Sequence, residues 1–132
     1  MKYRFTNTEL EKYPHTKDAI ALLDLLNERC HKHIKMVFTK ASGGRANLTH
    51  TQFTVPKHAL EKFGETYLYY YVIHEFTHCY ANNGTHDGQF KRTERKLLAL
   101  FGITIDYAKA YPRALYANGE KVYQKHITKS KR

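Results

Sequence analysis

Apolar positions change their spacing along this chain, and the changes mark out helices and short strands. Between residues 17 and 34, Ile and Leu recur at helical spacing. Residues 35–40 alternate between apolar and polar side chains and so predict a strand. Residues 45–55 are Thr-rich and half-alternating, which predicts two short strands. Pro56 after the second of them is typical of an edge strand.

A longer helix is predicted over residues 65–83, against the local composition. Residues 67–73 read Tyr-Leu-Tyr-Tyr-Tyr-Val-Ile and would suit a buried strand. They continue directly into His74-Glu-Phe-Thr-His78, and only a helix brings two histidines four apart to one face. We therefore expect a single helix, with Gly84 as its cap.

The rest of the chain predicts one more helix and a hairpin. A helix begins at His86–Asp87 and ends at Gly102, and a strand follows from Ile103. Asn118-Gly119 lies between alternating residues, which is the strongest short hairpin signal. The fold class is therefore α+β, with a small and mainly antiparallel sheet beside the helices.

Two histidines and a glutamate in the long predicted helix carry the clearest chemistry. Imidazole nitrogens bind zinc at about 2.0–2.1 Å, so His74 and His78 on one helix face suit two ligand positions. Glu75 beside them can take a proton from a metal-activated water. With nine histidines in 132 residues, one such motif arises by chance in roughly 4% of chains of this composition, so the neighbouring residues matter.

A catalytic zinc site needs a third protein ligand, and two residues compete for that role. His86 follows a turn-forming run, Asn-Asn-Gly, which can fold the chain back toward the first two ligands. Glu94 is a carboxylate on an otherwise apolar helix face. It would be a third ligand, would hold the outer nitrogen of a ligand histidine, or would pair with a neighbouring Lys or Arg. Asp87 is a second candidate to support a histidine, with helix N-capping as its alternative.

The order of these motifs resembles the SprT-like zinc metallopeptidases. They share His-Glu-x-x-His, a short variable loop, and His-x-Gly-x-Phe at the start of another helix. The matching residues in this sequence are His74, Glu75, His78, His86, Gly88 and Phe90. The resemblance implies a zincin-like α+β domain that holds one Zn²⁺ per chain and cleaves protein or peptide substrates on or near DNA. Many members also carry a cysteine-rich zinc ribbon, which the two cysteines of this chain cannot form.

The C-terminal residues 107–132 are strongly basic. They hold seven Lys/Arg and one Glu, and so contribute +6 of the formal net charge of +10. Tyrosines alternate with these cations, and rings can stack on bases while cations hold phosphates. This pattern predicts binding of single-stranded or junction DNA; solubility, or a hairpin that packs its tyrosines onto the domain, is the alternative. The nucleic-acid candidates are Lys109, Arg113, Tyr116, Lys121, Tyr123 and Lys125.

Length and composition predict one domain and a cytoplasmic setting. We assign residues 1–106 to a zincin-like part and residues 107–132 to a hairpin and basic tail of the same domain. The N-terminal residues lack the apolar run of a signal peptide, and no stretch reaches the roughly 18 apolar residues of a membrane span. Two isolated cysteines favour a reducing compartment. We expect a cytoplasmic or nucleoid-associated protein that is not secreted and has no membrane partner.

The sequence therefore predicts a zinc metallopeptidase in which Glu75 is the general base. Two alternatives remain open. A zinc hydrolase that acts on RNA can use three histidines without the glutamate. A nucleic-acid-binding module would carry a structural or inactive metal site, and a structural site would be closed by a fourth side chain.

Overall fold

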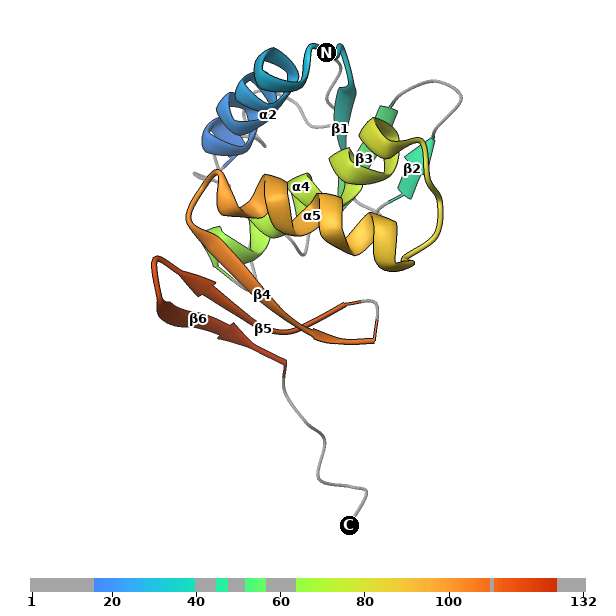
Figure 1. The fold of residues 1–132 in the computed structure, drawn as a ribbon. Helices are drawn as coiled ribbons and strands as arrows, with labels where there is room; N and C mark the ends of the chain where they lie inside the picture. Colours follow the sequence, from blue (N-terminus) through green and yellow to red (C-terminus); the bar gives the residue numbers. More distant parts are fainter. Residues whose placement is uncertain (1–15, 40–44, 48–51, 57–63, 110, 126–132) are drawn as a thin grey trace.

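Three helices and two small sheets make up the part of the chain that the computed structural model describes, which is residues 16–39, 45–47, 52–56, 64–109 and 111–125 (Figure 1). This confirms the predicted α+β class. None of the helices in these ranges has both the length and the apolar character to span a membrane. The helices are α2 (Thr16–Cys30), α4 (Glu65–Ala81) and α5 (Gly88–Ala99). The strands are β1 (Lys35–Thr39), β2 (Arg45–Asn47), β3 (Gln52–Pro56), β4 (Ile103–Ala108), β5 (Tyr111–Ala117) and β6 (Glu120–Gln124).

Helix α4 lies at the centre of the molecule. Figure 1 shows it behind α5, with α2 and strands β1–β3 on one side and strands β4–β6 on the other. All eight residues from 72 to 79 are buried, because α4 packs against α2, α5 and both sheets. A helix surrounded in this way can carry large apolar and aromatic side chains on several faces. The tyrosine-rich run at residues 67–73 is therefore helical, as predicted.

Helix α2 ends earlier than the apolar spacing predicts. The predicted end was near Ile34, but the helix stops at Cys30 and His31 adopts a left-handed backbone conformation with φ 56°. The Asn27 side chain then closes the loop, since it bonds both the N–H and the carbonyl of Ile34 at 2.9 Å. Ile34 is 2% exposed, so it joins the core from the strand side of the turn.

The first sheet has the order β1-β3-β2, with β1 parallel and β2 antiparallel to β3. The strand that Pro56 ends is therefore central, and its predicted edge position was wrong. Proline at the last residue removes a donor only from the end of the ladder, while Phe53 and Val55 bury the middle of the strand. The sequence also predicts a turn at residues 41–45, of which residues 41–44 lie outside the described residues.

The second sheet is the antiparallel meander β4-β5-β6. Asn118 and Gly119 form the β5–β6 turn with φ angles of 53° and 91°, as expected of the predicted hairpin. The described residues therefore form two sheets, where the sequence predicted one sheet and a hairpin. Three of their four strand pairings are antiparallel, in line with the predicted mainly antiparallel character. The proposed division between residues 106 and 107 falls inside β4. The predicted tail at residues 128–132 lies outside the described residues.

Candidate metal centre

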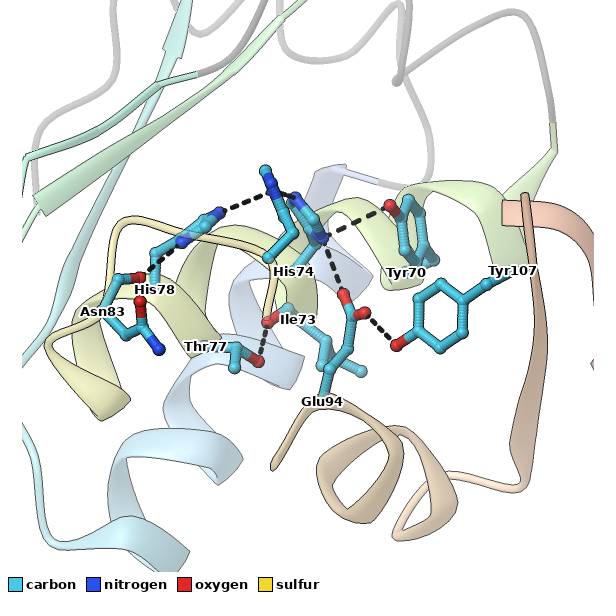
Figure 2. A network of polar contacts seen from close by, with 9 residues as sticks. Tyr70, Ile73, His74, Thr77, His78, Asn83, Glu94 and Tyr107 are labelled. Carbon is cyan, nitrogen blue, oxygen red and sulfur yellow. Dashed lines mark hydrogen bonds and ion pairs between the residues drawn. The ribbon is translucent and has the colours of Figure 1, made fainter. Parts of the chain in front are cut away.

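Three histidines from two segments converge on one point. His74 and His78 lie one turn apart on the same face of α4, and His86 precedes α5. The Nε2 atom of His86 lies 3.3 Å from Nε2 of His74 and 3.2 Å from Nε2 of His78. One nitrogen from each ring lies within 4.8 Å of the others, and in the described residues these three form the only such group (Figure 2).

The turn between the helices brings His86 back to the first two histidines. Asn82 ends α4 in a left-handed conformation with φ 51°, so the predicted cap at Gly84 was wrong by two residues. The Asn83 side chain then accepts hydrogen bonds from the N–H and the hydroxyl of Thr85. Asp87 caps the next helix, because its Oδ1 accepts from the Phe90 N–H at 3.0 Å.

The outer nitrogens of both α4 histidines are held by the protein. His74 Nδ1 lies 2.7 Å from Glu94 Oε2, and His78 Nδ1 lies 2.7 Å from the Asn83 carbonyl oxygen (Figure 2). A carboxylate and a carbonyl only accept, so each Nδ1 carries the proton and donates. In the neutral ring, each Nε2 then presents a lone pair toward the other histidines.

Glu94 is the centre of a buried network behind His74. Its side chain is fully buried, and its second oxygen, Oε1, accepts a 2.5 Å hydrogen bond from the Tyr107 hydroxyl. The Tyr70 hydroxyl lies 3.3 Å from the same Nδ1 of His74. Figure 2 shows these groups on one side of the His74 ring. The contact of Glu94 is thus with the outer nitrogen of His74, and Glu94 is not in the converging group.

The Phe90 side chain packs against all three histidine rings. It is fully buried, and its ring centroid lies 4.4 Å from that of His78 and 5.2 Å from those of His74 and His86. This contact explains why an aromatic residue follows His86 at this spacing. The ring limits the orientations open to the imidazoles and excludes water from beneath them.

Burial shifts the pKa values of three side chains at the site, His78, His86 and Glu75. Desolvation is the main cause that lowers the pKa of His78 and of His86, so both rings favour the neutral form that binds metals. Burial also raises the pKa of Glu75 to about 7; His74 opposes this shift and Glu94 adds to it. Glu75 is 7% exposed on the same turn of α4.

The donor set and its spacing fit a tetrahedral metal ion. At zinc–nitrogen distances of about 2.0–2.1 Å, tetrahedral angles place ligand nitrogens about 3.3–3.4 Å apart. The separations of His86 Nε2 from the other two Nε2 atoms, 3.2 and 3.3 Å, agree with that value. The three histidines can therefore hold a metal ion, and three nitrogen donors suit zinc among several transition metals.

The predicted nucleic-acid residues are spread over the second sheet, and several have protein partners. Arg113 forms a bidentate ion pair with Asp106, with both distances 3.1 Å. Lys121 donates to Gln124, and the Tyr123 ring lies 4.8 Å from that of Tyr67 on α4. The Tyr123 contact is the alternative in which the hairpin packs onto the domain. Tyr116 is half-buried, and Lys109 and Lys125 are exposed.

Three residues of the site were not predicted from the sequence as members of it. The Asn83 carbonyl supports His78, Tyr107 supports Glu94, and the Tyr111 ring lies 5.3 Å from His86. A main-chain carbonyl leaves no sequence signal. The two tyrosines were assigned to nucleic-acid stacking, and only the pairing of β4 with β5 beside α5 brings them to the histidines.

No protein-family model matches the chain, and no curated protein matches it. The function is therefore inferred from the residues of the site.

Proposed function

We propose that this chain is a zinc-dependent metallopeptidase of the SprT-like zincin type. Its ligands are His74, His78 and His86, and Glu75 is its general base. The observation that carries the proposal is the convergence of three histidine rings. Nε2 of His86 lies 3.2 Å from Nε2 of His78 and 3.3 Å from Nε2 of His74, while the outer nitrogens of the two α4 rings are hydrogen-bonded elsewhere. The order of the motif residues supports the family assignment.

A zinc ion in this position supplies Lewis-acid chemistry: it makes water more acidic and polarises a carbonyl group. Glu75 accepts the proton of the attacking water and delivers it to the leaving amine. Glu94 and the Asn83 carbonyl keep His74 and His78 in the tautomer that points Nε2 inward. Phe90 excludes water from beneath the three rings.

Two features favour a peptidase over the alternatives. A structural metal site would be closed by a fourth side chain, whereas the histidine group in the described residues has three members. Among the described residues, the group therefore leaves one tetrahedral position for water or substrate. The buried carboxyl of Glu75, next to the ligand His74, supplies the base that a three-histidine RNA hydrolase does not require.

DNA-associated protein is the substrate class that we propose. The formal net charge is +10. Part of this positive charge lies on the outer side of α5, close to the histidines. Arg92, Arg95 and Lys96 are exposed there, while the single carboxylate of α5, Glu94, is buried against His74. A polyanion bound along α5 would bring its attached protein close to the histidines. We also propose a cytoplasmic or nucleoid location. Neither cysteine forms a disulfide, which agrees with a reducing compartment.

The deciding experiment compares Glu75→Gln with the wild type. Zinc content is measured by mass spectrometry, and hydrolysis is measured with casein and a fluorogenic peptide library. We expect about one zinc per chain in both proteins and a loss of turnover of about 10²–10⁴-fold in the variant, because a general base contributes that much. Glu120→Gln is the matched control, since Glu120 is exposed in the β5–β6 hairpin.

Other outcomes would redirect the assignment. Full turnover by Glu75→Gln would refute the mechanism. Cleavage of RNA without cleavage of any peptide would support the nuclease alternative. X-ray absorption that shows four protein ligands and no oxygen from water would indicate a structural site.

A further inference from the structure

Three tyrosines surround the histidine group, and two of them are fully engaged behind it. The Tyr70 hydroxyl lies 3.3 Å from His74 Nδ1, and Tyr70 is 2% exposed. The Tyr107 hydroxyl donates to Glu94. Tyr70 is buried beside the outer nitrogen of His74, and Tyr107 is bonded to the carboxylate that holds this nitrogen, so neither hydroxyl is placed to meet a substrate.

Tyr111 differs from both. It is the first residue of β5 and is 56% exposed, yet its ring centroid lies 5.3 Å from that of His86 and 5.8 Å from that of His74. Within the described residues, its hydroxyl has no hydrogen-bond partner. A large side chain with a free donor thus lies against two of the proposed ligands while remaining open to solvent.

The hairpin that carries Tyr111 is anchored close by. Tyr107 lies four residues earlier, on β4, and its ring contacts Lys91 at 5.0 Å and Arg95 at 5.1 Å, both from α5. Its hydroxyl bond to Glu94 adds a second attachment. Tyr111 pairs with Ala108 in the β4–β5 ladder, so these contacts also fix the position of its backbone.

Three basic side chains in this region are engaged in cation–π contacts or an ion pair. Lys91 and Arg95 lie over the Tyr107 ring, and Arg113 forms its ion pair with Asp106. An oxyanion that forms at the histidines needs a donor beside them, and such a donor contributes much of the rate enhancement in acyl transfer. Of these cations and the three tyrosines, Tyr111 is the one that lies beside the histidines, is open to solvent, and has a hydroxyl with no hydrogen-bond partner in the described part of the chain.

We propose that the Tyr111 hydroxyl donates a hydrogen bond to the oxyanion of the tetrahedral intermediate in peptide hydrolysis, which rests on the proposed peptidase function. Water adds to the scissile carbonyl carbon while Glu75 takes its proton, and the carbonyl π electrons move to the oxygen. Tyr111 keeps its own proton and stabilises that oxygen. The C–N bond then breaks, the π bond re-forms, and the amine leaves with the proton from Glu75.

The test uses zinc-loaded full-length chain and a phosphinic pseudotetrapeptide, whose PO₂⁻ group imitates the tetrahedral intermediate. Binding is measured by titration calorimetry for the wild type, Tyr111→Phe and Tyr80→Phe. Tyr80 lies at the end of α4 with its ring against Phe76 and beside Lys32, and its variant loses the same hydroxyl. We expect Tyr111→Phe to keep its zinc and to bind the probe at least about ten-fold more weakly, as for one hydrogen bond to a charged group. Tyr80→Phe should bind as the wild type does.

Turnover of casein supplies the second measurement. In Tyr111→Phe we expect kcat to fall by about 10²-fold or more with KM nearly unchanged, because the bond forms only when charge develops. Equal probe binding and equal kcat in Tyr111→Phe would overturn the inference. So would a loss that appears in Tyr111→Ala but not in Tyr111→Phe, since the ring alone would then be responsible.

The two proposals fail in distinguishable ways. A wild-type chain that binds zinc and cleaves casein, with a Tyr111→Phe variant that does the same, removes only the role of Tyr111. A wild-type chain that neither cleaves casein nor binds the phosphinic probe removes the peptidase function and the role of Tyr111 with it.

Discussion

The carboxylate of Glu94 lies 2.7 Å from the Nδ1 atom of His74, across the interface between α5 and α4. The two residues are twenty positions apart, and both are buried. Because the Tyr107 hydroxyl occupies the other carboxylate oxygen, Glu94 has one orientation in which both oxygens are satisfied. Helix packing, the direction of His74 and the turn end of the β4–β5 hairpin are therefore coupled through one side chain.

Replacing Glu94 by Gln tests this coupling. The amide can no longer accept from both partners as a carboxylate does, and it removes the negative charge behind the ligand. We expect zinc affinity to fall by about 10–100-fold, as is typical when the group behind a ligand histidine is changed. Competition with a chromophoric chelator measures the affinity.

Glu120→Gln is the control for Glu94→Gln, because it makes the same change at an exposed site. Circular dichroism of both variants establishes that the fold is retained. Zinc affinity unchanged in Glu94→Gln would mean that the carboxylate only helps the helices to pack. Complete loss of zinc from Glu94→Gln, together with a carboxylate oxygen among the metal's ligands in the wild type, would instead make Glu94 a direct ligand.

His78→Ala tests the ligand set itself. The ring projects from the same face of α4 as His74, and its Nε2 lies 3.2 Å from that of His86. Two remaining histidines hold zinc poorly at neutral pH, so we expect the metal content to fall from about one per chain to near zero after dialysis. His33→Ala, at an exposed position before β1, should keep the metal. Equal zinc in both variants would place the site elsewhere.

Much of the site could be predicted from local sequence, because its three histidines lie within thirteen residues of one another. The spacing of His74 and His78 has meaning only on a helix, and this outweighed the strand-like composition of residues 67–73. Asn118-Gly119 specified its turn in the same local way. These features depend on backbone geometry over a few residues, which sequence patterns report well.

What sequence could not predict depends on contacts between distant segments. The central position of β3 follows from its parallel pairing with β1, and no residue within β3 encodes that pairing. Tyr107 and Tyr123 have similar basic neighbours in the sequence. In the structure, however, Tyr107 bonds Glu94 and Tyr123 packs on Tyr67. Their separate roles are set by the twist and register of the second sheet, which packing against α4 and α5 determines.

Gly102 is expected to be essential for the turn from α5 into β4. Its φ angle is +72°, and a Cβ atom there would lie 2.3 Å from Oδ1 of Asn118. Gly102→Ala should lower the free energy of unfolding by about 1–2 kcal/mol, the usual cost of a left-handed conformation with a side chain. Gly88→Ala is the comparison, since Gly88 opens α5 with a Cβ contact of 3.4 Å and should be neutral or stabilising. Urea unfolding measures both; equal stabilities would contradict the strain at Gly102.

Measurements of single-stranded DNA binding can decide which of two basic surfaces binds DNA. The sequence predicted the hairpin, where Lys121 and Lys125 are exposed, and the structure adds Arg92 and Lys96 on the outer side of α5. We expect charge reversal of Arg92 and Lys96 to weaken binding more, because α5 carries the ligand-supporting Glu94 and starts directly after His86. If both cations contact phosphates, the slope of log Kd against log salt should fall by about 1.4.

The control reverses Lys17 and Lys35, which are exposed on α2 and β1, so that all three double variants change the net charge equally. Fluorescence anisotropy of a labelled oligonucleotide at several salt concentrations gives the affinity and the slope together. Equal weakening in all three variants would indicate attraction to the overall charge rather than a binding face. Greater weakening in the Lys121 and Lys125 variant would restore the hairpin as the binding surface. If the wild type shows no salt-sensitive binding, the positive charge serves solubility and not DNA binding. The substrate would then be an ordinary protein recognised without DNA.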